Sequence, residues 1–326
     1  MTKIAWILAG LAIFVLASEK ALAWAQEGHA VVAAIAENLL SPITAAKVQK
    51  LLTEGGDKDL ISVASWADQV IIASHDEGPL RGNQEAIEFN QKFPKSGMWH
   101  FVNLPLGATS YEQVRSFVTP DDVIQAISRC IHVLESPTPE PETFTRIQAL
   151  RLLVHFVGDI HQPLHCGTGF YSFTEKSVPH LITDPAEAID KPSDRGGNLL
   201  FYGSNATEQL HALWDRVLVE KIDNSIEYRV LADFLAKSYL PKEMVKTSGD
   251  YHHWAEVWAI ESVRIAALAY RGITFGTVEL DSNQHILRIN IDLPTNYLDS
   301  NKGYAAQQLA RAGVRLAQLL DSIKWQ

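Results

Sequence analysis

The chain has 326 residues, of which 47% are hydrophobic, and a formal charge of −10 at neutral pH. That length and composition can bury a sizeable core. The acidic balance argues against a protein that grips long duplexes through phosphate contacts, so a nucleic-acid partner would be held locally or by bound metal. The two cysteines, Cys130 and Cys166, are too few for a disulfide scaffold and could form one bridge or stay as buried thiols.

Residues 1–23 are predicted to be a secretory signal peptide. Lys3 supplies the positive charge, residues 4–17 are apolar, and the Ala-Leu-Ala stretch at 21–23 is a small-x-small cleavage site. The apolar stretch is too short to span a bilayer comfortably, which disfavours a membrane anchor. Cleavage would leave a secreted or periplasmic chain that begins at Trp24 in an oxidising compartment.

Apolar residues recur at helical spacing along most of the remaining chain, which predicts a mainly α fold. A β-hairpin is predicted near 277–292, where two alternating runs flank a polar turn. No linker composition separates the helical segments, so residues 24–326 are expected to form a single domain. The predicted helices cover residues 29–40, 43–53, 120–135, 145–160, 208–221, 228–237, 251–270 and 304–323.

Two His-x-x-x-Asp pairs on apolar helices indicate metal chemistry. His155 and Asp159, in "LLVHFVGDIHQPLHCG", are one helical turn apart and therefore share a face. His211 and Asp215 repeat the spacing in "EQLHALWDRVL". His165 follows a proline turn and can reach back toward the first pair. Imidazole and carboxylate without thiolate suit zinc in a catalytic site.

Two further candidates stand beside tryptophans, Asp68 in "ASWADQV" and His100 in "MWHFVNLP". Taken alone, a His-x-x-x-Asp pair is more often a surface or core hydrogen bond than a metal site, and Asp68 or His100 alone is a weaker signal still. Together the candidates exceed what one tetrahedral zinc needs, which predicts a cluster of two or more metals and a multi-metal hydrolase. Histidines outside these motifs, such as His75, are expected to be surface or structural residues.

The motifs "WAQEGH", "WAD", "WHFVNLP", "HFVGDIHQPLH", "GGN" and "LHALWD" occur in the order found in one enzyme family. Over essentially all of residues 24–323, the chain resembles the zinc-dependent single-strand-specific nucleases of the nuclease S-one/P-one type. The resemblance implies the helical phospholipase C/P-one nuclease fold, with three zinc ions at the bottom of a cleft.

The resemblance also implies a ligand set. By position, the ligands of the first zinc would be Asp68, His100, His155 and Asp159, and those of the second would be His165, His211 and Asp215. The third zinc would be held by His29, by Asp159, and by the α-amino nitrogen and carbonyl oxygen of Trp24. A free α-amino group has a pKa near 8, so zinc can displace its proton at modest cost.

The implied activity is endonucleolytic hydrolysis of 3′-O–P bonds in single-stranded DNA and RNA to 5′-nucleotides, with 3′-nucleotidase activity. Asp68 would be catalytic, orienting a zinc-bound hydroxide, and Phe101 and Asn103 match positions that stack on and hydrogen-bond a nucleobase. The mature enzyme would be a monomer without a membrane partner. A zinc-dependent phospholipase C is the first alternative, and a non-catalytic zinc-binding protein is the second.

Two features depart from the family pattern. Family nucleases often carry Arg or Lys three residues after the motif aspartate, where this chain has Ile71. Either another cation, such as Arg195 or Arg216, substitutes, or the rate or substrate range differs. The stretch 167–197 is polar and rich in Pro, Gly, Ser and Asp, which predicts a surface loop. We hypothesise that residues 168–194 cover the cleft rim and tune substrate choice.

Overall fold

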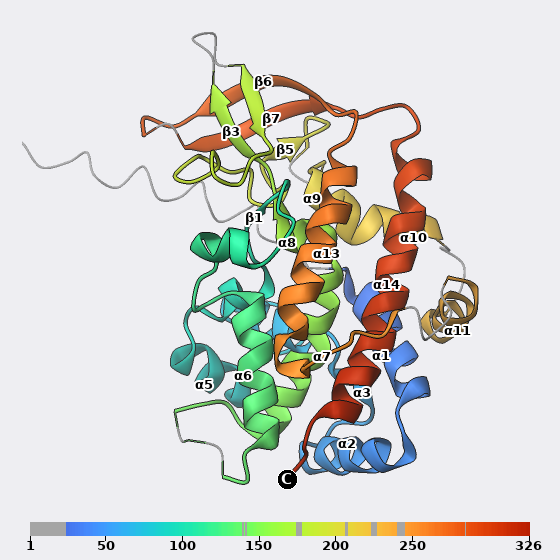
Figure 1. The fold of residues 1–326 in the computed structure, drawn as a ribbon. Helices are drawn as coiled ribbons and strands as arrows, with labels where there is room; N and C mark the ends of the chain where they lie inside the picture. The colour runs from blue at the N-terminus through green and yellow to red at the C-terminus, as the bar shows by residue number, and fades with distance from the viewer. Residues whose placement is uncertain are drawn as a thin grey trace, which may run out of the picture.

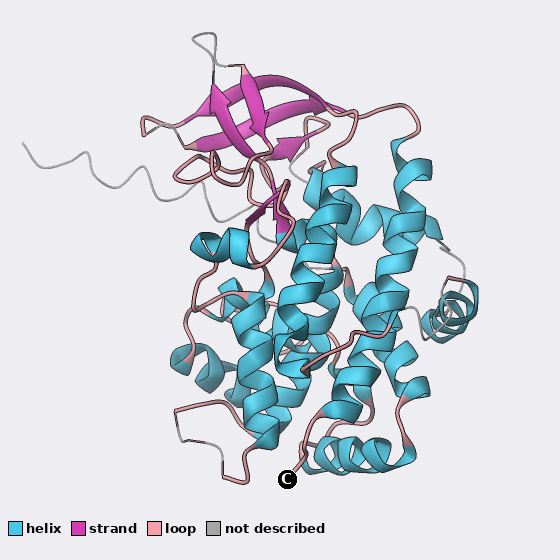
Figure 2. Ribbon diagram, in the orientation of Figure 1, coloured by secondary structure: helices cyan, strands magenta, loops and turns pink. Residues whose placement is uncertain are grey.

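The computed structural model describes residues 24–138, 140, 142–173, 178–205, 208–222, 227–239, 245–283 and 285–326. The predicted signal peptide lies outside the described residues. Helices dominate the described chain, and the strands gather at one end of the helical body (Figures 1 and 2), which confirms the mainly α prediction. None of the described helices combines the length and apolar character needed to cross a membrane.

All eight predicted helical segments are helical. Their starts follow capping rules: the Ser41 hydroxyl accepts from the Thr44 amide, and Thr145 and Gln148 form a capping box. The segment predicted at 208–221 divides into three consecutive elements of different helical type. The helices are α1 (Gln26–Leu39), α2 (Pro42–Glu54), α6 (Val123–Glu135), α7 (Arg146–His161), α9 (Leu210–Ala212), the π-helical η3 (Leu213–Val217), α10 (Leu218–Ile222), α11 (Tyr228–Ser238), α13 (Trp254–Ala269) and α14 (Tyr297–Ser322).

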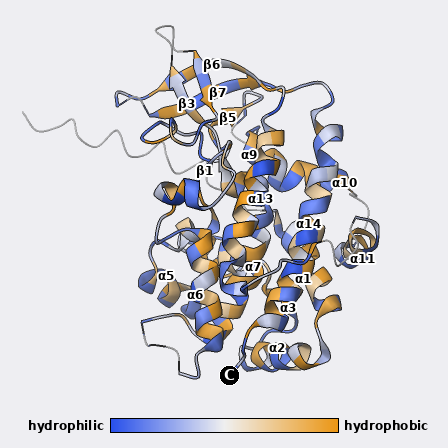
Figure 3. Ribbon diagram, viewed as in Figure 1, coloured by the Kyte–Doolittle hydropathy of each residue, from blue (hydrophilic) through white to orange (hydrophobic). Residues whose placement is uncertain are grey.

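Helix α7 runs through the centre of the core. It packs against α1, α6, α13 and α14, and every residue from Ala149 to His161 is buried. The outer helices carry hydrophobic and hydrophilic residues along their length, as expected of helices that bury one face (Figure 3). Because α7 is enclosed on all sides, each polar side chain on it requires a partner inside the protein.

Several short helices escaped the sequence prediction, because a few residues cannot establish helical periodicity. Three of them, α4, η1 and α8, carry the predicted ligands Asp68, His100 and His165. The short helices are α3 (Leu60–Val63), α4 (Trp66–Ala73), α5 (Gln84–Lys92), α8 (Pro163–Cys166) and the 3₁₀ turns η1 (Ser96–His100), η2 (Glu112–Phe117) and η4 (Tyr251–His253).

The predicted hairpin near 277–292 is confirmed as antiparallel strands β6 (Thr274–Leu280) and β7 (Ile286–Asp292). Strand β5 (Leu200–Phe201) extends this sheet, parallel to β7.

The surface-loop prediction for 167–197 is wrong in part. Strand β2 (Gly167–Thr168) pairs with β1 (Leu104–Pro105), and β3 (Phe170–Phe173) pairs antiparallel with β4 (Pro179–Ile182). The interspersed aromatic and aliphatic residues give this polar stretch enough apolar surface to pack, and Tyr171 is fully buried.

Both cysteines are buried thiols without a disulfide, Cys130 on α6 and Cys166 on α8. Burial raises the pKa of each thiol, so neither is poised to act as a nucleophile. Of the two alternatives that the sequence left open, the structure therefore favours the buried thiols.

Candidate metal centre

The eight ligand side chains nominated from the sequence converge at the centre of the helical body. They come from α1, α4, η1, α7, α8, α9 and η3, and every one is buried: His29, Asp68, His100, His155, Asp159, His165, His211 and Asp215. Their nitrogen and oxygen atoms form three groups, and within each group the atoms lie within 4.8 Å of one another. Two of these groups share His155, and the third adjoins them where His165 Nδ1 lies 3.8 Å from Asp159 Oδ1, so the groups make one extended cluster.

The first part of the cluster surrounds α7. His155 Nε2 lies 3.3 Å from Asp159 Oδ2 and 3.4 Å from Asp68 Oδ1. His100 Nδ1 is 2.9 Å from Asp159 Oδ2, and His29 Nε2 is 3.4 Å from the other Asp159 oxygen. The predicted one-turn spacing on α7 therefore places Asp159 between three imidazoles.

The second part contains His165, His211 and Asp215. The two imidazoles stack with centroids 4.9 Å apart. His211 Nε2 lies 3.4 Å from Asp215 Oδ2, and His165 Nε2 lies 3.9 Å from Asp215 Oδ1. Asp215 sits in the π-helical turn η3, where periodicity predicts an ordinary helix. Such wide turns occur frequently at functional sites because they redirect a side chain.

Backbone carbonyls fix the orientation of three histidines. The Nδ1 atoms of His155, His165 and His211 each lie 2.7 Å from a carbonyl oxygen, those of Ala64, His100 and Gly196 respectively. If Nδ1 carries the proton, it donates to the carbonyl and leaves Nε2 as a lone-pair donor directed at the cluster. This arrangement is the usual support for a histidine that binds metal.

Burial and the neighbouring carboxylates together set the charge of the cluster. Burial lowers the pKa of His165 to about 3, which keeps that imidazole neutral, and burial raises the pKa of Asp215 to about 6. Burial also opposes charge on His155, but the carboxylates of Asp159 and Asp68 outweigh it and raise the pKa of His155 well above its usual value. The cluster therefore favours positive charge at its centre.

Several buried polar atoms of the cluster lack a hydrogen-bond partner in the described chain. They are both ring nitrogens of His29, both carboxylate oxygens of Asp159, Nε2 of His165 and Oδ2 of Asp215. An unsatisfied buried polar atom costs about 1–3 kcal/mol, and a charged one costs more. So many in one place is explained by cations that the groups would bind, and the donor set fits zinc.

The first described residue lies against this cluster. The buried Trp24 indole donates to the Gly158 carbonyl (2.9 Å), and the Ala25 amide donates to the Asp215 carbonyl (3.0 Å). Gly158 is required by close packing, because a Cβ there would lie 2.7 Å from His29 Nδ1. Sequence reasoning missed Gly158, although a glycine directly before Asp159 in an apolar helix is a visible signal.

Gln162 is a second residue that sequence reasoning missed. It is fully buried, and its side-chain amide donates to Asp215 Oδ1 (2.6 Å) while its oxygen accepts from the Leu164 amide (2.6 Å). It therefore holds the carboxylate of Asp215 in place.

A cleft of about 830 Å³ opens onto the cluster, and its lining includes Asp68, His100, His165 and His211. Phe101 and Asn103 also line it, both half-buried. The Thr168 hydroxyl donates to Asn103 Oδ1 (2.8 Å), which leaves the amide NH₂ of Asn103 to donate to a ligand. The structure thus brings the predicted base-binding pair to the same cleft as the metal-binding groups.

The residues that line the cleft can be compared with three expectations from the sequence. His75, expected to be a surface or structural residue, lines the cleft. Ile71 lines it as well, together with Arg195, whereas Arg216 is not among the lining residues. Of the described residues between 168 and 194, only Ser193 lines the cleft, so most of that segment lies away from the wall.

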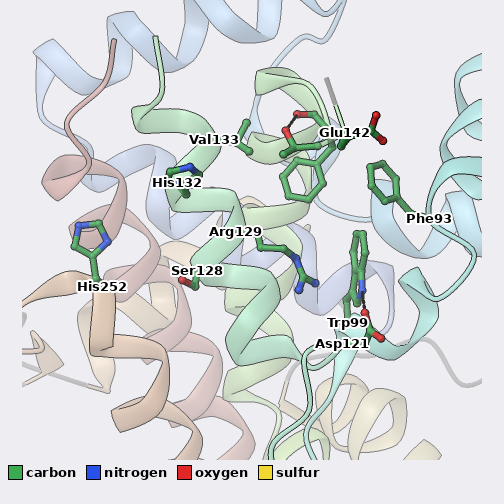
Figure 4. Close-up of a pocket in the computed structure, with 11 residues that line it drawn as sticks. Phe93, Trp99, Asp121, Ser128, Arg129, His132, Val133, Glu142 and His252 are labelled. Atoms are coloured by element: carbon green, nitrogen blue, oxygen red, sulfur yellow. Dashed lines mark hydrogen bonds between the residues drawn. The ribbon is translucent and has the colours of Figure 1, made fainter. Parts of the chain in front are cut away.

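A second cavity, of about 560 Å³, is lined by Trp99 of η1 together with Arg129 and Asp121 (Figure 4). The Arg129 guanidinium carbon sits 4.7 Å from the centre of the Trp99 ring, and Arg129 Nη1 donates to the Pro120 carbonyl (2.6 Å). No group that could hold a metal lies there among the described residues. The metal-capable groups therefore belong to the cleft.

Comparison with known proteins agrees with this geometry. The family model described as S1/P1 nuclease matches residues 24–324. The chain is 27% identical to Endonuclease 2 of Arabidopsis thaliana, over 92% of this chain and 90% of that protein. It is 26% identical to Nuclease S1 of Aspergillus oryzae (92% and 91%) and to Nuclease P1 of Penicillium citrinum (92% and 97%). The chain therefore belongs to the S1/P1 nuclease family, as a phosphodiester-cleaving hydrolase with the helical phospholipase C/P1 nuclease fold.

Proposed function

We propose that the mature protein is a secreted or periplasmic zinc endonuclease. It cleaves 3′-O–P bonds of single-stranded DNA and RNA to 5′-nucleotides and also has 3′-nucleotidase activity. It acts as a monomer, formed by the single domain 24–326 after removal of residues 1–23. The observation that carries the proposal is the cluster of incompletely hydrogen-bonded histidines and aspartates at the base of an open cleft.

Three zinc ions account for these unsatisfied atoms. Four side chains would hold the first zinc, and three side chains would hold the second. The third zinc would be held by two side chains and by the first residue of the mature chain. Bound zinc makes water a nucleophile near neutral pH and offsets the charge of a phosphoryl group. The proposed ligands are Asp68, His100, His155 and Asp159 for the first, His165, His211 and Asp215 for the second, and Trp24, His29 and Asp159 for the third.

The chain's own residues orient the reactants. Asp68 lies at the boundary between cluster and cleft, where its carboxylate can orient the attacking water and accept its hydrogen bond. Phe101 offers a ring on which a base can stack, and the Asn103 amide can donate to that base. A base reaches these residues only when it is splayed out of a helix, which favours single strands over duplex.

The substrate is assigned as a nucleic acid and not a phospholipid for two reasons. The relatives are named nucleases and endonucleases, and the cleft contains the Phe101–Asn103 pair. A lipid phosphodiester would instead require an apolar rim that meets a membrane surface.

Signal-peptide cleavage would also complete the zinc site. Trp24 is buried against Gly158, one residue from Asp159, and Ala25 is bound to the Asp215 backbone. A free α-amino group at Trp24 would thus start beside both aspartates, and its pKa near 8 permits deprotonation by a metal.

The test compares processed protein that begins at Trp24 with a version that retains Ala23. Zinc content is measured by elemental analysis, and hydrolysis is measured on denatured DNA, duplex DNA and phosphatidylcholine at equal enzyme. We expect three zinc ions and preference for denatured DNA in the processed protein, and fewer zinc ions with lower activity in the longer version. Equal zinc and activity would refute the role of Trp24, and preference for phosphatidylcholine would refute the substrate.

A further inference from the structure

Among the described residues that line the cleft, Arg195 is the one arginine or lysine. The other charged or titratable lining residues are Asp68 and the four histidines of the cleft. The chain as a whole carries a formal charge of −10, which repels a polyanionic strand. An anionic substrate that enters this cleft therefore meets one permanently cationic side chain among the described lining residues, and it is that of Arg195.

The backbone at Arg195 is held in an unusual conformation. Arg195, Gly196 and Gly197 have φ values of 56°, 63° and 80°, so three consecutive residues are left-handed. Glycine adopts this region freely, but arginine does so at a cost of about 1 kcal/mol or more. Gly196 has no room for a side chain, because a Cβ there would lie 2.1 Å from the Leu164 carbonyl oxygen. Strain of this kind persists where the surrounding structure enforces it, and it is common at binding sites.

The enforcing element is Asp194, whose carboxylate is completely buried. Its Oδ1 accepts from the amides of Gly169 (3.2 Å) and Gly197 (3.0 Å). Its Oδ2 accepts from the hydroxyls of Tyr171 (2.7 Å) and Tyr270 (2.9 Å). Four donors from β3, the end of α13 and two loops thus fix the residue directly before Arg195.

The other side of the turn is tied to the metal centre. The Gly196 carbonyl accepts from His211 Nδ1 (2.7 Å). The Arg195 carbonyl accepts from the Asn198 amide (3.3 Å) and side chain (2.9 Å), so the arginine backbone is committed to the turn. The Arg195 side chain is exposed and makes no ion pair within the described chain. The turn therefore presents an unpaired guanidinium to the cleft beside His211.

We propose that Arg195 holds a phosphate of the nucleic-acid strand in the cleft, and that Asp194 is the positioning residue that aims it. This inference rests on the proposed function. A guanidinium binds a phosphate through two parallel charge-assisted hydrogen bonds, and a fixed backbone reduces the entropy lost on binding. Ile71, which also lines the cleft, is apolar and cannot perform this task.

The test uses processed, zinc-loaded protein carrying Arg195→Gln, Arg195→Lys or the matched control Arg216→Gln. Arg216 pairs with Glu220 (3.8 Å) and does not line the cleft. For single-stranded oligonucleotides, we expect Arg195→Gln to lower kcat/KM by about 10- to 100-fold. The slope of log kcat/KM against log salt should fall by about 0.7, the value for one phosphate contact on a single strand. Arg195→Lys should lose less, and Arg216→Gln should match the wild type in rate and slope.

Arg195→Gly separates binding from folding. Glycine relieves the left-handed strain, so thermal unfolding should occur at the same or a higher temperature while kcat/KM falls as it does in Arg195→Gln. Millimolar guanidinium should restore part of the activity of Arg195→Gly and none of that of Arg195→Gln. A lower unfolding temperature in Arg195→Gly together with no guanidinium rescue would assign Arg195 a structural role and overturn the inference.

Three further results would also overturn the inference. They are an unchanged salt slope in Arg195→Gln, an equal loss in Arg216→Gln, and a loss confined to guanine-containing strands, which would mean that Arg195 reads a base. If the wild type cleaves no nucleic acid, the proposed function fails, and calorimetric binding of inorganic phosphate replaces kinetics. Arg195→Gln should then still bind phosphate at least tenfold more weakly than Arg216→Gln, and equal binding would refute the anion-binding role.

Discussion

Two completely buried carboxylates, Asp194 and Asp159, have opposite surroundings. Asp194 accepts hydrogen bonds from two backbone amides and two tyrosine hydroxyls. Asp159 is equally buried, but its oxygens face the ring nitrogens of His29, His100 and His155 without a hydrogen bond to any of them in the described chain. A carboxylate that receives its hydrogen bonds from the fold has a structural role. A carboxylate surrounded by imidazole nitrogens instead has its charge balanced only when cations bind between these groups. The Asp194 network and the metal-binding cluster meet at Gly196. This residue comes two positions after Asp194, and its carbonyl accepts a hydrogen bond from His211 of the cluster.

Helix α7 repeats the contrast with two histidines. His155 directs Nε2 at Asp68 and Asp159. His161 instead contacts residues outside the metal-binding cluster: Nδ1 lies 2.8 Å from the Val157 carbonyl, and Nε2 lies 3.1 Å from Arg315 Nη1. Burial, together with the Arg315 charge, lowers the pKa of His161 well below its usual value, so it is neutral and can accept from arginine. Two histidines less than two turns apart therefore have different roles because their partners differ.

Metal removal should give the largest effect. If it had no effect, the contrast between the Asp159 and Asp194 networks would be wrong. Chelation of the processed protein should abolish hydrolysis and lower the free energy of unfolding by about 4 kcal/mol or more, the linkage expected at a thousandfold excess over Kd. Calorimetry with and without chelator, followed by zinc addition, measures the change. Equal stability in both forms would mean that the cluster is satisfied without cations.

Asp194→Ala should have the next largest effect, on stability and not on zinc content. It strands two hydroxyls and two buried backbone amides, which should lower the free energy of unfolding by about 3 kcal/mol. Asp159→Ala is the matched variant, because it should lose zinc. Urea denaturation and elemental analysis of both proteins provide the test, and loss of zinc from Asp194→Ala would remove the distinction between the two networks.

The satisfied network should also be detectable by its pH dependence. Burial raises the pKa of Asp194 to about 6, despite its four donors. A raised carboxyl pKa contributes stability at low pH that is lost as pH rises through the folded value. The free energy of unfolding of wild type relative to Asp194→Asn should therefore fall by about 2 kcal/mol between pH 4 and 6. The comparison uses metal-free proteins, and a flat or rising difference would contradict it.

The smallest predicted effect concerns Gln162, which supports Asp215. Gln162→Met should weaken the zinc of the second group about tenfold, the lower end of what loss of such a supporting contact costs. Gln308 provides the control, because it is similarly buried but donates to the His161 carbonyl and Ser262, outside the metal-binding cluster. Competition with a zinc-binding dye should show a weaker site in Gln162→Met alone. Equal weakening by Gln308→Met would show that any buried amide matters.

Local spacing accounts for what could be predicted from the sequence. The period of apolar residues located the long helices, and one helical turn fixed His155 beside Asp159. The hairpin was visible because β6 and β7 alternate around a polar turn. Each of these features depends on neighbours a few residues away.

The remaining features depend on contacts between distant segments. Asp194 meets Tyr270 across 76 residues, and Trp24 meets Gly158 across 134. The π-helical turn at Asp215 has no periodic signature, and the buried strands of 167–197 were concealed by polar composition. Residue types could nominate ligands, but they could not show which carboxylate the fold would satisfy.

The short helix η1 has a practical consequence for protein engineering. Gly97, Met98 and His100 face the cleft, while Trp99, in the same turn, faces the separate cavity beside Arg129. Substitutions in that rear cavity can therefore shift His100 without adding or removing an atom in the cleft. A library of substitutions at Arg129 and its neighbours would alter the position of His100 through Trp99. Every residue that contacts the substrate would keep its native identity.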